Sequence, residues 1–144
     1  MAKSKEEERK AKEHIILMAT ALKFQYGTNN SLIIAQRRGI DLGWCETDVG
    51  SSYFGEKSGR MEIKINKKYK NNYEKQVLVC AHELGHIYLE HKGKNYYKDR
   101  NIDLEYAANL FALTLIYGRH FLNDDLINKD SYELHNFMEK KLKG

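Results

Sequence analysis

The sequence predicts a single α+β domain, in which two N-terminal helices precede a small antiparallel sheet of about three strands and further helices follow. Apolar residues recur every three or four positions over residues 5–26, which is typical of an amphipathic helix. The period changes to two over residues 61–66, where apolar and polar residues alternate as in a half-buried strand. Residues 73–92 and 103–117 then leave few polar positions, which indicates buried helices. This order of elements is that of an α+β domain.

The remaining elements are placed by local signals. A second helix is expected over residues 31–38, with Ser31 as its N-cap. Two less regular strands are expected over residues 40–46 and 48–54, and a final helix starts near Asp130. Four glycines are placed to end helices: they are Gly27, Gly39, Gly93 and Gly118.

Length and composition exclude several classes of protein. The 144 residues, 42% of them hydrophobic and 31% charged, suit one domain over residues 1–144, with residues 1–12 expected to fray. The longest apolar stretches fall short of the roughly 20 residues that cross a bilayer, and the charged N-terminus lacks the apolar part of a secretory signal. Cys45 and Cys80 make neither a disulfide scaffold nor a cysteine-rich zinc module. We therefore expect a cytoplasmic protein without membrane association. Direct nucleic-acid binding is not expected, because the net charge is only +4 and the basic residues are spread along the chain, whereas such binding needs them gathered on one face.

One segment has the spacing of a metal site. His82 and His86 are four residues apart, so on a helix both imidazoles face the same side and can bind one metal ion. Glu83 lies about 100° round the helix from His82, where it can approach a metal-bound water without being a ligand. The alternative is that both are ordinary helix histidines facing solvent or capping the core. Apolar neighbours make this helix buried, however, and there two histidines and a carboxylate need partners.

A catalytic zinc site also needs a third protein ligand and an open position for water. The metzincin pattern HExxHxxGxxH is excluded, because Leu89 and Lys92 stand where it requires glycine and histidine. Glu105 is the expected third ligand, since the eighteen residues 87–104 allow the chain to turn between two helices. The alternative is an ordinary glutamate in the first turn of a helix. Asn109 lies one turn after Glu105, where its amide can orient a histidine ligand.

Two runs in this region resemble the ImmA/IrrE family of zinc metallopeptidases. They are AHELGHIYLEH at residues 81–91 and EYAANLFA at residues 105–112. The family's active region has HELGH, a gap, and a glutamate followed by Ala-Asn/Asp-x-Phe-Ala. The resemblance covers about residues 31–117 and includes the short strands ahead of the first run. The chain departs from the family at Ala107, where another glutamate is frequent, and over residues 115–118, where Leu-Leu-Met-Pro is common.

The resemblance implies a zincin-like fold with one Zn²⁺ per chain. The implied site residues are His82, His86 and Glu105 as metal ligands, Glu83 as the catalytic residue, and Asn109 as support for a ligand. Family members act in bacteria and their mobile elements, such as phages, where they cleave or otherwise inactivate a helix-turn-helix repressor. Some relatives carry a fused DNA-binding domain, which we do not expect within these 144 residues.

Further expectations concern residues outside this set. Zinc would stabilise the oxyanion, the negatively charged oxygen of the tetrahedral intermediate in peptide hydrolysis. A second group that stabilises it is expected but not assigned, and the candidates are Tyr88, His91, Tyr117, His120, Tyr132 and His135. His91 fits better as a residue near a helix C-terminus, and His14, His120 and His135 are expected at the surface. Cys80 is expected in the core, and Trp44 and Phe54 beside the sheet. The strand 61–66 is expected to be an edge to which an extended peptide can add, and the alternative is an ordinary paired strand.

Three functions follow from these observations. The first is a zinc endopeptidase that cleaves a helix-turn-helix repressor and so releases genes of a mobile element or a stress response. The second is a non-catalytic anti-repressor that binds the repressor and keeps a structural or vestigial zinc site. The third, a zinc hydrolase of small molecules, is less favoured because a sheet edge beside the metal-site helix suits a polypeptide. A site of two histidines and a glutamate also accepts manganese or other divalent ions.

Overall fold

The computed structural model describes residues 4–46, 52–57, 59–93, 95–121 and 124–143. The helices and strands follow one another as α1 (Lys5–Tyr26), α2 (Ser31–Arg38), β1 (Asp41–Cys45), β2 (Ser52–Lys57), β3 (Arg60–Asn66), α3 (Tyr73–Leu89), α4 (Leu104–Tyr117) and α5 (Ser131–Lys143). Short 3-10 turns include η1 (Lys67–Tyr69), η2 (Glu90–Lys92), η3 (Lys98–Arg100) and η5 (Leu126–Asn128). The α+β class is confirmed. No helix in the described ranges combines the length and the apolar character needed to cross a membrane.

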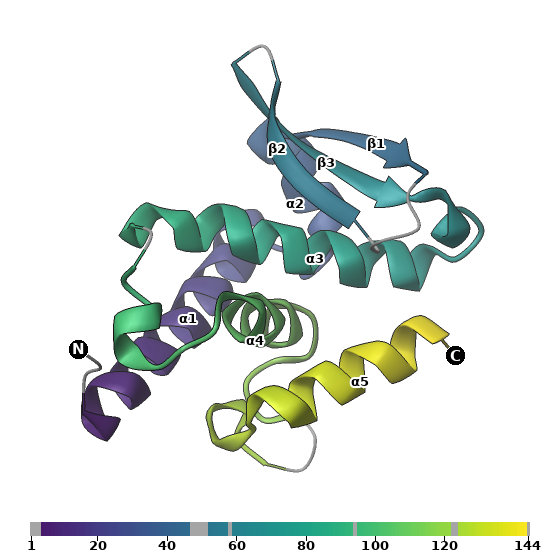
Figure 1. Cartoon of the computed structure of the whole chain (residues 1–144). Helices are drawn as coiled ribbons and strands as arrows, with labels where there is room; N and C mark the ends of the chain where they lie inside the picture. The colour runs from purple at the N-terminus through teal and green to yellow at the C-terminus, as the bar shows by residue number, and fades with distance from the viewer. Residues whose placement is uncertain (1–3, 47–51, 58, 94, 122–123, 144) are drawn as a thin grey trace.

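Helix α3 lies at the centre of the arrangement. Figure 1 shows α2 and the sheet on one side of it, and α1, α4 and α5 on the other. Helices α2 and α4 both pack directly on α3, while α1 and α5 pack on α4. Helix α4 is the most deeply enclosed of these elements, because every residue from 106 to 115 is buried. The two helices expected to carry the metal site therefore form the core of the molecule.

The N-terminal helices begin and end close to the predicted positions, with one correction. Gly27 and Gly39 both have positive φ angles, 66° and 86°, and end α1 and α2 as expected. The N-cap of α2 is Asn30 and not Ser31, because the Asn30 side chain accepts a hydrogen bond from the backbone N–H of Leu32 at 3.0 Å. The hydroxyl of Ser31 is fully buried and donates instead to the backbone carbonyl of Val77 at 2.6 Å. Ser31 thus ties α2 to α3.

The sheet is mixed, and the predicted antiparallel arrangement is wrong for one of its two pairings. The strand order is β1-β3-β2, with β2 antiparallel and β1 parallel to β3. The reason is topological: β2 runs in the direction opposite to β1, and β3 reverses direction after β2 and lies between the two. Strand β1 consequently runs in the same direction as β3. The expected strand 48–54 lies partly outside the described residues, and β2 begins at Ser52.

Strand β3 is the central strand, so the expectation that residues 61–66 form a free edge is wrong. It is paired with β1 through Leu42↔Ile63 and Trp44↔Ile65, and with β2 on its other side. Ile63 and Ile65 are buried on the face toward the helices, whereas Trp44 at the β1 edge keeps 42% of its surface exposed. Strands β1 and β2 are the two edges, and β2 lies against α3.

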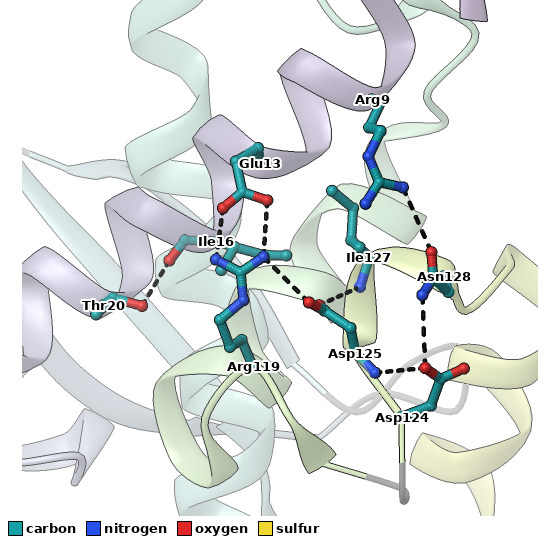
Figure 2. Close-up of polar contacts among 9 residues, drawn as sticks. All are labelled: Arg9, Glu13, Ile16, Thr20, Arg119, Asp124, Asp125, Ile127 and Asn128. Carbon is teal, nitrogen blue, oxygen red and sulfur yellow. Dashed lines mark hydrogen bonds and ion pairs between the residues drawn. The ribbon is translucent and has the colours of Figure 1, made fainter. Parts of the chain in front are cut away.

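A polar network holds α1 against the segment that follows α4. Figure 2 shows the Arg119 guanidinium between Glu13 of α1 and Asp125, to which it donates hydrogen bonds of 2.8 and 3.2 Å. Arg9 of α1 reaches Asn128 in the same region at 3.4 Å. A guanidinium that engages two carboxylates is well suited to fix the relative position of two segments. The network therefore secures α1 on the outer side of α4.

Candidate metal centre

The metal-site residues are positioned by the middle of α3 and the first turn of α4. Helix α3 begins at Tyr73, after Asn72, whose side chain accepts a hydrogen bond from the Lys75 N–H. Helix α4 begins after Asp103, which accepts from the backbone N–H of Glu105 at 2.7 Å. Asp103 was not among the predicted caps, although an aspartate directly before an apolar helical run is a favoured N-cap. This cap holds the turn that carries Glu105.

The structure brings His82, His86 and Glu105 together, and we call these three residues the triad. One ligand atom from each lies within 4.8 Å of the other two. The Nε2 atoms of the two histidines are 3.2 Å apart, and His82 Nε2 is 3.4 Å from Glu105 Oε1. Both separations are close to the edge of about 3.3 Å expected between ligands of a tetrahedral zinc site. His86 Nε2 lies nearer, at 2.6 Å from Glu105 Oε2, as in a charge-assisted hydrogen bond.

A hydrogen bond from α4 orients the first histidine. Asn109 Oδ1 lies 2.8 Å from His82 Nδ1. An amide oxygen can only accept, so Nδ1 carries the proton and the lone pair of Nε2 faces His86 and Glu105. This is the tautomer that a metal ligand needs. Two imidazoles and a carboxylate, one of them oriented in this way, fit a divalent metal ion with nitrogen and oxygen preference.

The triad is also an electrostatic unit. Burial disfavours the charged form of His82, but hydrogen bonding to Glu105 and the charges of Glu83 and Glu105 outweigh it, so that the pKa of His82 is raised. Hydrogen bonds from His82 and His86 hold the pKa of Glu105 far below its ordinary value. Glu105 is therefore a carboxylate at neutral pH, and it can act as an anionic ligand.

Glu83 and Cys80 lie on other faces of α3. Glu83 is buried, with 5% of its surface exposed, and its charge acts on the adjacent His82. Cys80 is fully buried, and burial raises the pKa of its thiol to about 12. Such a thiol is not a nucleophile at neutral pH. Cys80 thus lies in the core, as predicted.

A close contact between α3 and α4 depends on Gly85, which was not among the predicted site residues. A Cβ atom at this position would lie 3.1 Å from the Cα and carbonyl oxygen of Ala108, and 3.2 Å from the Cβ of Phe111. Gly85 stands between the two triad histidines in sequence, and Ala108 lies next to Asn109. The absent side chain at Gly85 therefore permits the helix approach that brings the triad together.

The candidate oxyanion donors lie in varied surroundings. Tyr88 stacks on Phe111, with ring centroids 6.0 Å apart, and Tyr117 stacks on Phe121 near the end of α4. Tyr132 is 73% exposed. His120 and His135 are exposed, as expected, whereas the side chain of His91 lies outside the described residues. His14, expected at the surface, is half-buried, and burial lowers its pKa.

Residues 35–142 match the family model of peptidase M78, described as the IrrE N-terminal-like domain. The chain belongs to this family. The resemblance to ImmA/IrrE proteins drawn from the two sequence runs is therefore confirmed. Membership in the M78 family indicates a metallopeptidase-like protein, and the triad is a group of side chains that can hold a metal ion. No curated protein and no solved structure matches the chain.

Proposed function

We propose that this M78 family member is a zinc-dependent endopeptidase that cleaves a helix-turn-helix repressor and thereby releases the genes which that repressor silences. The observation that carries the proposal is the triad: two imidazoles, one of them oriented by Asn109, and one carboxylate, contributed by two helices that pack on each other, with the charge of the buried Glu83 acting on His82. In this proposal His82, His86 and Glu105 bind one Zn²⁺, and Asn109 keeps His82 in its ligand tautomer.

In the proposed hydrolysis of a peptide bond, the triad and Glu83 have different roles. Zinc held by the triad would supply Lewis acidity toward a peptide carbonyl and lower the pKa of a water molecule to about 7. Glu83 takes a proton from the attacking water and passes it to the departing amine. Glu83 is not among the ligands, so its carboxylate remains available for this transfer, and burial at 5% exposure keeps competing solvent away from it.

The sheet supports a polypeptide substrate. Strand β2 is an edge strand that lies against α3, so backbone groups along this edge can pair with an extended peptide that crosses the metal-site helix. The choice of a repressor as substrate rests on the resemblance to the ImmA/IrrE family. Because such repressors act on the chromosome, the proposal places the reaction in the cytoplasm.

The test is Glu83→Gln, with Glu74→Gln as the matched control on the exposed first turn of the same helix. The substrate is a helix-turn-helix protein encoded next to this chain. We expect Glu83→Gln to keep about one zinc per chain and to slow cleavage about a thousandfold, because the ligands remain and the base is lost. Glu74→Gln should change neither quantity. His82→Ala should lose both the metal and the cleavage.

Two results would contradict the proposal. Cleavage of the repressor by Glu83→Gln protein at the wild-type rate would remove Glu83 from the mechanism. Relief of repression by Glu83→Gln in cells, without a cut product, would instead identify an anti-repressor that acts by binding. Metal analysis of the purified chain separates zinc from manganese.

A further inference from the structure

A cavity of about 450 Å³ opens between the end of α3 and the start of α4. It is lined by His86, Leu89, Glu90, Gly93 and Leu104. Its volume falls in the range of sites that hold a ligand or a substrate side chain. His86 belongs both to the triad and to this wall, so a peptide whose carbonyl lies at the triad places a neighbouring side chain at the cavity.

Most of the wall suits an aliphatic chain. Leu89 is buried, with 2% of its surface exposed, and Leu104 is half-buried immediately before Glu105. Gly93 has a φ angle of 91°, and apart from its chain neighbours no atom lies within 4 Å of the position that a Cβ atom would take, so there is an opening beside this residue. The two leucines can cover methylene groups, while the opening at Gly93 leaves room for a side chain of some length.

The remaining wall residue carries a negative charge. Glu90 is exposed, and its backbone N–H donates to the carbonyl of His86, which places it one helical turn beyond His86 on the same face. Lys92, the next described cation along the chain, is directed at Tyr96, with its Nζ 5.4 Å from the ring centroid. Within the described ranges, no ion pair involves Glu90.

We propose that this cavity receives a lysine or arginine side chain of the substrate, next to the bond that is cleaved. Its aliphatic stem lies on Leu89 and Leu104, and its cationic head pairs with Glu90. One helical turn is about 5.4 Å, a distance that the four-carbon stem of lysine can span from the triad to Glu90. Glu90 and Leu104 determine specificity in this account and take no part in the chemistry. The inference rests on the endopeptidase function proposed above.

Binding of short peptide hydroxamates to the zinc-loaded chain tests the inference without requiring cleavage. Three probes differ only in the side chain next to the hydroxamate, which is lysine, its uncharged analogue norleucine, or glutamate. By calorimetry we expect the lysine probe to bind about tenfold more tightly than the norleucine probe, and the glutamate probe to bind most weakly. Glu90→Gln should abolish the preference for lysine over norleucine. Glu74→Gln, which changes an exposed carboxylate at the other end of α3, should retain it.

Leu104→Ala provides a second measurement and should weaken the lysine and norleucine probes alike, because it removes surface under the stem that both share. Equal affinity of these two probes for the wild-type chain would overturn the inference. So would a lysine preference that survives Glu90→Gln, or the failure of every probe to bind. If the probes bind in the expected order but no repressor is cleaved, the endopeptidase function fails while the assignment of the cavity stands.

Discussion

Gly85→Ala tests whether the approach of α3 and α4 controls the metal site. The added Cβ would lie 3.1 Å from two backbone atoms of Ala108, which no side-chain rotation can relieve, so α4 has to shift by a few tenths of an ångström. Overpacking of this kind costs about 1–3 kcal/mol, and the greater helix propensity of alanine offsets about 1 kcal/mol of it. We expect the free energy of unfolding to fall by about 1 kcal/mol. The affinity for zinc should fall about tenfold, because the displaced backbone of α4 carries both Glu105 and Asn109.

The assay pairs urea unfolding of the metal-free protein with zinc titration against a chromophoric chelator. Ala21→Gly is the matched control, since Ala21 is exposed in the interior of α1 and reports the propensity difference alone. It should destabilise the protein by about 1 kcal/mol and leave zinc affinity unchanged. If Gly85→Ala instead stabilises the protein by the amount that Ala21→Gly costs, with unaltered zinc affinity, then the helices have room for the methyl group and the prediction is wrong.

Three further predictions concern buried or charged groups. Tyr97→Phe should raise the free energy of unfolding by about 1 kcal/mol, because the fully buried Tyr97 hydroxyl has no hydrogen-bond partner among the described residues. Urea unfolding measures this, and a loss of stability would contradict it. A thiol reagent at pH 8 should label half-buried Cys45 but not Cys80, whose pKa is raised to about 12, and rapid labelling of both in the folded protein would be inconsistent with that burial. In the metal-free protein, the lowered pKa of Glu105 stabilises the fold above the ordinary value of 4.5, and this contribution is lost as pH falls through the folded-state pKa. The raised pKa of His82 stabilises the fold below the ordinary value of 6.5, and this contribution is lost as pH rises through the folded-state pKa. Glu105→Gln should therefore lower the free energy of unfolding most between the ordinary pKa values of 4.5 and 6.5, and by no more than about 1 kcal/mol because Glu105 is exposed. A loss of stability that does not vary from pH 4 to 8 would refute the coupling between Glu105 and His82.

The sequence was most informative where structure depends on neighbours along the chain. Periodicity and a terminal glycine place α1 at residues 5–26, because a helix is built from contacts three and four residues apart. The same spacing puts His82 and His86 on one face of α3. The pairing of these histidines with Glu105, however, came from the resemblance as much as from spacing, since the approach of α3 and α4 depends on packing around Gly85 that no local pattern reveals.

Errors arose where the deciding contact is distant in sequence. Asn30 and Ser31 are both good N-caps. The choice between them depends on the Val77 carbonyl, 46 residues further along the chain, which accepts a hydrogen bond from the Ser31 hydroxyl. The parallel pairing of β1 with β3 likewise depends on the insertion of β3 beside β2, a matter of topology to which strand periodicity is insensitive. The prediction that His14 lies at the surface is wrong for a related reason, because elements distant in sequence, such as η3 and η5, pack on α1.

The position of α1 has a consequence for how the boundaries of this protein are drawn. The family match begins at residue 35, whereas α1 ends at Tyr26, so the helix lies outside the part of the chain that similarity recognises. Yet α1 packs on α4, where it contributes the buried side chains of Ile15 and Ile16, and Arg119 fastens it in place (Figure 2). A fragment limited to the matched residues would expose to water the side of α4 that α1 covers. Helix α4 is the one that carries Glu105. The part of the chain that the family match covers is thus smaller than the part that packs together, because one side of the helix that carries Glu105 is covered by a helix outside the match.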